Sequence, residues 1–420
     1  MTYYSKVFEK IPLDTDDVAQ ALLDIEHKTR SNPLKWTGQF SPQLVNVLIN
    51  KYGCKSSRIF DPFLGSGTVL LEAGRVGITA CGSELNPAAV ILARTYEFIN
   101  VGPAKRKKII GSFSSRLEKA FPMKWNNYED ATTVDSAHKI MSSLKILREQ
   151  LDDYLSIVLI EALIILIDFH KVESLSENKV LKTWNKLKRH ILNLPSTLNQ
   201  IAVYHADARN TPIASSTIDF VLSSPPYINV FNYHQQYRRS AEALDWELLS
   251  IAKSEFGSNR KHRGNRFFTV TQYCIDIAHT LSEIIRITND NSRCIFVLGR
   301  ESNVCGTPFY NGAIFLALAS RLGFQSPMRQ ERKFKNRFGK HIVEDIIHLH
   351  PPTRQVVQFE LLDSVAKEVS LKALQDSLDI VPQKSLRFLE QAIRNVDNIN
   401  PSPVFTMSSQ SRNGVKNYAL

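Results

Sequence analysis

Several features that would point directly to a function are absent or scarce in this sequence. The five cysteines are scattered, and no two of them have the spacing of a zinc site. Five cysteines in a chain of 420 residues also argue against a disulfide framework. The most apolar stretch, residues 155–169, is shorter than a membrane-spanning helix and contains Glu161 and Asp168. The first ten residues lack the hydrophobic region of a signal peptide. We therefore expect a cytoplasmic protein with reduced cysteines, no metal site and no membrane partner.

The charge is unbalanced toward the positive sign. Lysine and arginine number 52 against 41 aspartate and glutamate residues, which gives a net charge of +11 over 420 residues. A basic protein suits a polyanionic partner, and nucleic acid is the commonest one. Composition alone is equally compatible with a protein that binds no nucleic acid. The chain is long enough for one large core or two domains.

A strand, a glycine loop, a helix and a second strand follow one another over residues 57–82. This order predicts a βαβ unit, and hence a parallel sheet with right-handed crossovers. Two helices are predicted before the unit, over residues 14–29 and 42–49. Further strands are predicted over residues 201–205, 218–222, 294–298 and 342–349, and further helices over 271–288 and 312–322.

The glycine loop, Asp61-Pro62-Phe63-Leu64-Gly65-Ser66-Gly67-Thr68, follows the first of these strands. Gly65 and Gly67 permit a tight turn, and the N-terminus of the next helix suits a carboxylate or a phosphate. No lysine follows Gly67, so the loop is not a P-loop, and it does not fit GxGxxG. S-adenosylmethionine is a better ligand, because Asp61 could pair with its ammonium group. The alternative is a plain strand–helix turn in which Asp61 is only a cap.

Two further acids follow predicted strands. Glu84 lies about twenty residues beyond the glycine loop, where an acid can accept hydrogen bonds from ribose hydroxyls. The alternative is an acid that only complements a helix N-terminus. Asp207 ends the strand at 201–205 and could accept from an adenine amino group, although aspartate is also common in turns.

The tetrad Ser224-Pro225-Pro226-Tyr227 follows the strand at 218–222. Two consecutive prolines cannot continue a strand, so they form a stiff elbow at its carboxyl end, where open α/β sheets bind ligands. The Ser224 hydroxyl and a proline carbonyl can hold an –NH2 group, while the Tyr227 ring can stack on the base that carries it. The alternative is a plain turn with a packed tyrosine.

Taken in order, DPFLGSGT, SELNP, HADAR and SSPPY resemble the motifs of S-adenosylmethionine-dependent amino-methyltransferases, above all the DNA enzymes that modify cytosine N4 or adenine N6. Phe40-Ser41-Pro42 resembles their upstream cofactor motif. The resemblance covers residues 35–100 and 201–350. It implies a Rossmann-like class I methyltransferase fold of the α/β class, with a seven-stranded, mostly parallel sheet. The cofactor-binding residues that it implies are Phe40, Ser41, Asp61, Phe63, Gly65, Gly67, Thr68, Glu84 and Asp207.

The predicted organisation has five parts. Residues 1–103 hold N-terminal helices and the cofactor-binding half of the methyltransferase domain, and residues 104–200 form a helical insertion. Residues 201–350 hold the catalytic half. A helical segment follows over 351–397, and the polar residues 398–420 are predicted to be a disordered tail.

The resemblance implies a site-specific DNA methyltransferase with Ser224, Pro225, Pro226 and Tyr227 as the catalytic residues. Methyl transfer is direct, and the target base leaves the duplex to reach the site. A serine at the first tetrad position favours cytosine N4, within a restriction–modification system that includes a cognate endonuclease. Adenine-N6 methylation is the first alternative. An RNA guanine-N2 methyltransferase and a non-catalytic DNA-binding protein are the others.

Basic residues after the tetrad are the predicted contacts to double-stranded DNA, because they can neutralise phosphates. They are Arg260, Lys261, Arg263 and Arg266. A second basic segment, residues 329–340, is equally compatible with DNA contact and with a solvated face. Aromatic and basic residues closer to the tetrad could shape or gate its pocket; these are Tyr233, Tyr237, Arg238 and Arg239.

Overall fold

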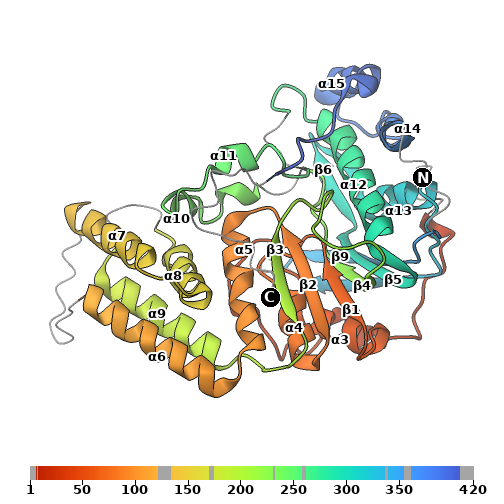
Figure 1. Ribbon diagram of the computed structural model, residues 1–420. Helices are drawn as coiled ribbons and strands as arrows, with labels where there is room; N and C mark the ends of the chain where they lie inside the picture. The colour runs from red at the N-terminus through yellow and green to blue at the C-terminus, as the bar shows by residue number, and fades with distance from the viewer. Residues whose placement is uncertain are drawn as a thin grey trace.

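The computed structural model describes residues 6, 8–121, 134–169, 175–229, 232–257, 262–335, 339–353 and 361–406. Its centre is a seven-stranded sheet with the strand order β3-β2-β1-β4-β5-β9-β8 (Figure 1). The first five strands in that order are parallel, whereas β9 is antiparallel to both β5 and β8. The sheet consists of β1 (Arg58–Asp61), β2 (Thr79–Glu84), β3 (Ile201–His205), β4 (Ile218–Ser223), β5 (Thr288–Gly299), β8 (Arg329–Lys335) and β9 (His341–Leu349). The predicted α/β class with a mostly parallel sheet is confirmed.

Helices cover both faces of this sheet, which gives three layers. Successive residues of a strand face opposite sides, so Ile59 belongs to one hydrophobic core and Phe60 to the other. The first core includes residues of α3 (Pro42–Tyr52), α4 (Thr68–Val76) and α5 (Pro87–Arg94). The second includes residues of α12 (Phe268–Ile287), α13 (Asn311–Arg321), α14 (Leu362–Gln375) and α15 (Gln383–Arg394).

Four helices lie beside α5, at the left of Figure 1: α6 (Pro103–Ala120), α7 (Val134–Glu149), α8 (Tyr154–Ile167) and α9 (Glu177–Leu192). The described residues between 104 and 200 contain no strand. Arg106 belongs to a basic run of the sequence, yet its side chain is buried and donates hydrogen bonds to five backbone carbonyls. Two of these carbonyls precede α6 and three lie at or after the end of α9. The side chain therefore joins both ends of this helical block.

Two predicted elements near the sheet edge differ from the structure. The helix expected over 14–29 is wrong: only α2 (Gln20–Asp24) forms, and Ile25 ends it with a left-handed φ of 57°. The Asp14 side chain instead accepts a hydrogen bond from the Asp17 amide and closes a turn. Strand β8 was not predicted, since its alternating charges resemble a solvated segment. Among the described residues, two short helices, α10 (Arg238–Glu242) and α11 (Leu248–Ile251), and the hairpin of β6 (Glu301–Val304) and β7 (Thr307–Tyr310) are also additions.

The segment 399–406 is ordered against the domain, so the predicted disorder is wrong for this part of the tail. Ser402 is buried and donates to Asp276, and the Phe405 ring lies 4.8 Å from that of His205. Residues 407–420 lie outside the described residues. In the part of the chain that the structure describes, no helix combines the length and apolar character needed to cross a bilayer.

Candidate active site

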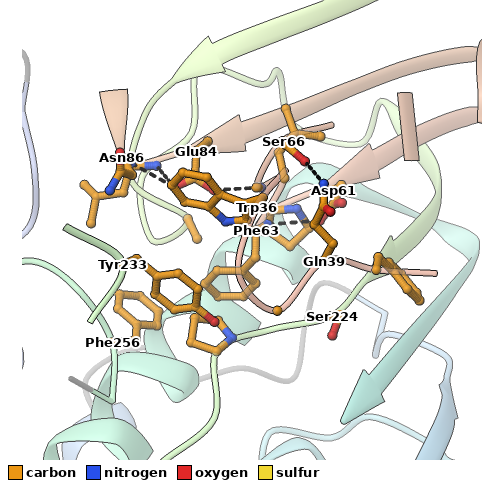
Figure 2. Close-up of a pocket in the computed structure, with 18 of the residues that line it drawn as sticks. Trp36, Gln39, Asp61, Phe63, Ser66, Glu84, Asn86, Ser224, Tyr233 and Phe256 are labelled. Atoms are coloured by element: carbon orange, nitrogen blue, oxygen red, sulfur yellow. Dashed lines mark hydrogen bonds between the residues drawn. The ribbon is translucent and has the colours of Figure 1, made fainter. Parts of the chain in front are cut away.

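The sequence of the strands reverses between β1 and β4, since β1 leads to β2 and β3 on one side while β4 and β5 lie on the other. Open α/β sheets bind ligands outside the carboxyl ends of their strands at such a switch point. A pocket lies there, and it is lined by residues from the ends of β1, β2, β3 and β4 (Figure 2). Of the predicted cofactor residues, the pocket lining includes Phe40, Asp61, Phe63, Gly65, Thr68, Glu84 and Asp207.

The glycine loop has the tight geometry that its sequence predicted. Gly65 and Gly67 have left-handed φ angles of 52° and 90°, and Gly67 is the N-cap of α4. A Cβ atom on Gly67 would lie 2.7 Å from the Tyr96 ring, so no larger side chain fits there without a shift. Gly67 itself does not line the pocket, and its role is to shape the loop that does.

Asp61 ends β1 with a buried carboxylate. Its Oδ1 accepts hydrogen bonds from Ser223 Oγ at 2.6 Å and from the Phe63 amide at 3.1 Å. Among the described residues, Oδ2 accepts none. Burial raises the pKa of Asp61 to about 7, and the nearby charge of Glu84 adds to this shift. A cationic ligand would offset the cost of ionising this group, so the site fits the ammonium of the expected cofactor.

Glu84 lies at the end of β2 and holds the glycine loop. Its Oε1 accepts from the amides of Leu85 and Asn86, and its Oε2 accepts from the Gly65 amide at 2.8 Å. Burial raises the pKa of Glu84, and the charge of Glu255 raises it further. A carboxylate oxygen can accept two hydrogen bonds, so Oε2 retains room for one ribose hydroxyl.

Asp207 lines the pocket, but its carboxylate is already satisfied. Oδ1 accepts from the backbone amide and from Nε of Arg209, while Oδ2 accepts from Arg209 Nη2 and the Phe405 amide. Four hydrogen bonds fill the capacity of a carboxylate. The predicted contact between Asp207 and an adenine amino group therefore does not fit this arrangement. The sequence could not reveal that Asp207 is already fully hydrogen-bonded, because Phe405 lies in a segment expected to be disordered.

The segment before α3 covers the glycine loop. Phe40 lines the pocket, whereas Ser41 is the N-cap of α3 and does not. Gln39 donates to Ser66 Oγ at 2.7 Å, and a Cβ on Gly65 would lie 3.3 Å from the Trp36 ring. Trp36 and Gln39 both line the pocket and were missed, since only the adjacent Phe40-Ser41-Pro42 matched a known motif.

The tetrad is divided between the pocket and the protein interior. Ser224 and Pro226 line the pocket, while Pro225 is buried and Tyr227 does not contribute to the lining. A Cβ on Gly299 would lie 2.9 Å from the Tyr227 ring, and the Tyr227 hydroxyl lies 3.5 Å from Ser224 Oγ. Burial raises the pKa of Tyr227, so its phenol stays protonated at neutral pH. Base stacking by Tyr227 stays a prediction.

An aromatic wall encloses the pocket on the side away from the strands. Tyr233 and Phe256 lie together there, as Figure 2 shows. The rings of Tyr233 and Trp36 are nearly parallel, with an interplanar angle of 7° and centroids 6.3 Å apart. Tyr237 also stacks on Trp36, at an angle of 20°. Tyr233 was among the residues predicted to shape the pocket, whereas Phe256 carries no motif and was missed.

The predicted DNA contacts are only partly described. Arg260 and Lys261 lie outside the described residues, Arg263 is exposed, and Arg266 is half-buried. Two arginines of the second basic segment are paired within the sheet: Arg329 with Glu331 on β8, and Arg332 with Glu344 on β9. This disfavours a role of these two arginines in DNA contact, whereas Lys333 and Lys335 on the same strand are exposed.

The charged side chains among the described lining residues are all acidic. Four carboxylates line the pocket, one of them neutralised by Arg209, and none of the described lining residues is a lysine, arginine or histidine. In the described ranges, no three His, Cys, Asp or Glu side chains are grouped as metal ligands would be. A small cation that also offers ribose hydroxyls fits this lining better than a nucleotide phosphate does.

Comparison with known proteins agrees with this chemistry. Residues 5–94 match the model of the N6/N4 methyltransferase family, described as DNA methylase. Two similar proteins are Type II methyltransferases. M.MjaII of Methanocaldococcus jannaschii is 33% identical over 104 residues, 22% of this chain and 19% of that protein. M.BsoBI of Geobacillus stearothermophilus is 39% identical over 69 residues, 16% of this chain and 14% of that protein.

A third similar protein is the tRNA (guanine(10)-N2)-dimethyltransferase of Methanothermobacter thermautotrophicus, 35% identical over 71 residues, 16% of this chain and 21% of that protein. The chain thus spans about a fifth or less of the length of these relatives. A solved S-adenosylmethionine-dependent methyltransferase from Methanosarcina mazei overlaps 72% of this chain and 96% of its own, with 10% identity and a TM-score of 0.33. At this identity and TM-score, the comparison carries no argument about the fold beyond the strand order described above.

The strand order, the switch-point pocket and the family match support the predicted class: a methyltransferase of the S-adenosylmethionine-dependent type, with S-adenosylmethionine as its cofactor. The matches also support the resemblance to the N4/N6 DNA methylases. They do not distinguish N4 from N6.

Proposed function

We propose that this protein is a DNA methyltransferase that transfers the methyl group of S-adenosylmethionine to cytosine N4 in duplex DNA. The observation that carries the proposal is the position of Ser224, which lines the same pocket as the acids Asp61 and Glu84. A group that can hold an exocyclic amine thereby borders the site suited to the methyl donor.

The roles of the pocket residues follow from their chemistry. Asp61 and Glu84 bind the ammonium and ribose of the cofactor, which supplies an electrophilic methyl group when bound. Ser224 Oγ, which lines the pocket, would accept one hydrogen bond from the target –NH2 group. The backbone carbonyl of Pro225, whose ring is buried, would accept the second. These bonds draw the nitrogen toward tetrahedral geometry and orient its lone pair toward the donor side of the pocket. No covalent bond between enzyme and base is needed: the N–CH3 bond would form as the S–CH3 bond of the donor breaks, S-adenosylhomocysteine would leave, and the methylated nitrogen would lose one proton to solvent.

Duplex DNA as the substrate is supported by the net charge of +11 and by the match to the DNA methylase family. The target amine is paired in a duplex, so the base has to rotate out of the stack to reach Ser224. Exposed Arg263 is one described cation on the segment that follows the tetrad. We further propose that the enzyme acts at a specific site, together with a cognate restriction endonuclease.

Two alternatives concern the base and the polymer. Adenine N6 carries the same –NH2 chemistry, and serine at the first tetrad position is our reason for preferring cytosine N4. Guanine N2 in RNA is the second alternative, and its support is the 71-residue similarity to a tRNA methyltransferase.

The test is methyl transfer from tritiated S-adenosylmethionine to duplex DNA and, in parallel, to tRNA. Label in DNA alone is expected. Label in tRNA alone would contradict the proposed polymer, and no label in either would contradict the proposed activity.

A further inference from the structure

Glu255 is a buried residue of the pocket wall. The proposed function gives its carboxylate no role. Its side chain is 5% exposed, and it lines the pocket together with its neighbour Phe256. Oε2 lies 2.7 Å from Nδ1 of His234, which is also buried. Oε1 has no hydrogen-bond partner among the described residues. A buried oxygen without a partner is costly, so a donor from a ligand would be stabilising there.

The surroundings of Glu255 place it at the nucleoside end of the pocket. The Phe256 ring meets the ring of Phe63 edge to face, with centroids 5.5 Å apart. The guanidinium of Arg209 lies over the Phe256 ring, 4.8 Å from its centroid, and pairs with Asp207. The charge of Glu255 also raises the pKa of Glu84. Glu255 thus lines the same pocket as both acids that were predicted to bind adenosine.

These two acids leave adenosine with too few acceptors. Asp207 has no acceptor position left, and Glu84 has one on Oε2. Adenosine offers three donor groups, namely two ribose hydroxyls and the 6-amino group. Oε1 of Glu255 is an acceptor on the same pocket that the protein itself leaves unused.

We propose that Glu255 is a cofactor-binding residue whose Oε1 accepts a hydrogen bond from the adenosine moiety of S-adenosylmethionine, with His234 as the positioning residue that holds its other oxygen. The inference rests on the proposed cofactor. It assigns to Glu255 the acceptor role that the sequence motif had assigned to Asp207.

Isothermal titration calorimetry with S-adenosylhomocysteine tests this on the full chain. Glu255→Ala should bind about 10- to 100-fold more weakly than the native protein, as expected for the loss of a hydrogen bond to a charged group. Glu247→Ala, in the same segment but exposed, is the matched control and should bind like the native protein. Glu255→Gln retains the side-chain volume and replaces the alanine variant if that variant does not fold. We expect Glu255→Gln to bind S-adenosylhomocysteine about tenfold more weakly than the native protein.

Three analogues identify the donor: the 6-oxo compound S-inosylhomocysteine and the 2′-deoxy and 3′-deoxy forms of S-adenosylhomocysteine. The analogue that lacks the relevant donor should bind equally to the native protein and the Glu255 variant, which also shows that the variant is folded. Equal loss for every analogue would indicate a merely structural role and overturn the inference, as would native affinity in Glu255→Ala. If the native protein bound no S-adenosylhomocysteine, that result would contradict the proposed cofactor as well. Binding without methyl transfer to DNA would contradict only the proposed substrate.

Discussion

Ser223 Oγ donates a 2.6 Å hydrogen bond to Asp61 Oδ1, and this bond joins the carboxyl end of β4 to that of β1. Both residues are buried. The carboxylate expected to meet the cofactor ammonium is thus fixed by the residue directly before Ser224. One buried hydrogen bond thus connects the part of the site expected to bind the methyl donor with the part expected to bind the target amine.

Cofactor affinity should depend on pH through Asp61. Its pKa is raised to about 7 by burial, and only the ionised form attracts an ammonium group. Affinity for S-adenosylhomocysteine should therefore rise about tenfold per pH unit below about pH 7 and level off above it. Calorimetric titration from pH 5.5 to about 8.5 checks this, and Asp61→Asn should bind weakly without that slope. A pH-independent affinity in the native protein would contradict the assignment.

The same group should affect the unliganded fold with the opposite sign. Asp61 holds its proton more tightly in the folded protein, where its pKa is about 7, than in the unfolded chain, where it has the ordinary pKa of 3.8. Its contribution to the free energy of unfolding is thus greatest at low pH and declines as the pH rises from about 4 to 7. Asp61→Asn should remove that decline in urea unfolding measured across this range.

Replacing Ser223 and Ser224 separately should give different defects. Ser223→Ala removes a bond that lowers the pKa of Asp61, so cofactor affinity should fall near pH 7 and recover at higher pH. Ser224→Ala should leave cofactor affinity unchanged and reduce the single-turnover methylation rate by about 100-fold, a typical cost of removing one positioned hydrogen-bonding group. Full turnover in Ser224→Ala would show that this serine does not hold the amine.

Arg106 should be needed for the stability of the helical block. Arg106→Ala would leave five backbone carbonyls, four of them on buried residues, without their shared donor. The free energy of unfolding should therefore fall by at least about 3 kcal/mol. Lys107→Ala, one residue further along α6 and exposed, should change it by less than about 0.5 kcal/mol. Urea unfolding monitored by circular dichroism compares the two, and equal stabilities would contradict the structural role.

Arg263 should contribute to DNA affinity by charge. Arg263→Ala is expected to weaken binding to any duplex and to reduce the salt dependence of the logarithm of the binding constant by about one unit. Arg321→Ala, which removes an exposed charge on α13, is the control and should behave like the native protein. Fluorescence anisotropy at several salt concentrations measures both slopes.

The central sheet could be predicted because its strands carry local signals. Buried strands such as β3 and β4 are apolar runs, and their ranges match the predictions to within one residue. β8 carries no such signal: its arginines are neutralised by Glu331 and Glu344, and the second of these lies on the neighbouring strand β9. Pairing with another strand is not visible in a local pattern of charges.

The candidate site divides in the same way. Asp61 and Glu84 lie inside contiguous motifs next to strands, and both line the pocket. Glu255 and Phe256 reach the pocket from a loop with no motif, and Phe405 satisfies Asp207 from 198 residues away. Contacts between residues so far apart in the chain leave no recognisable pattern in the sequence.

The most direct test of the proposed function is to digest enzymatically methylated duplex DNA to nucleosides and analyse them by mass spectrometry, with S-adenosylmethionine labelled in its methyl group. We expect labelled N4-methyl-2′-deoxycytidine with the native protein, and no such product with Ser224→Ala. Labelled N6-methyladenine nucleoside would contradict the choice of base, and unlabelled DNA alongside a labelled tRNA control would contradict the proposal as a whole.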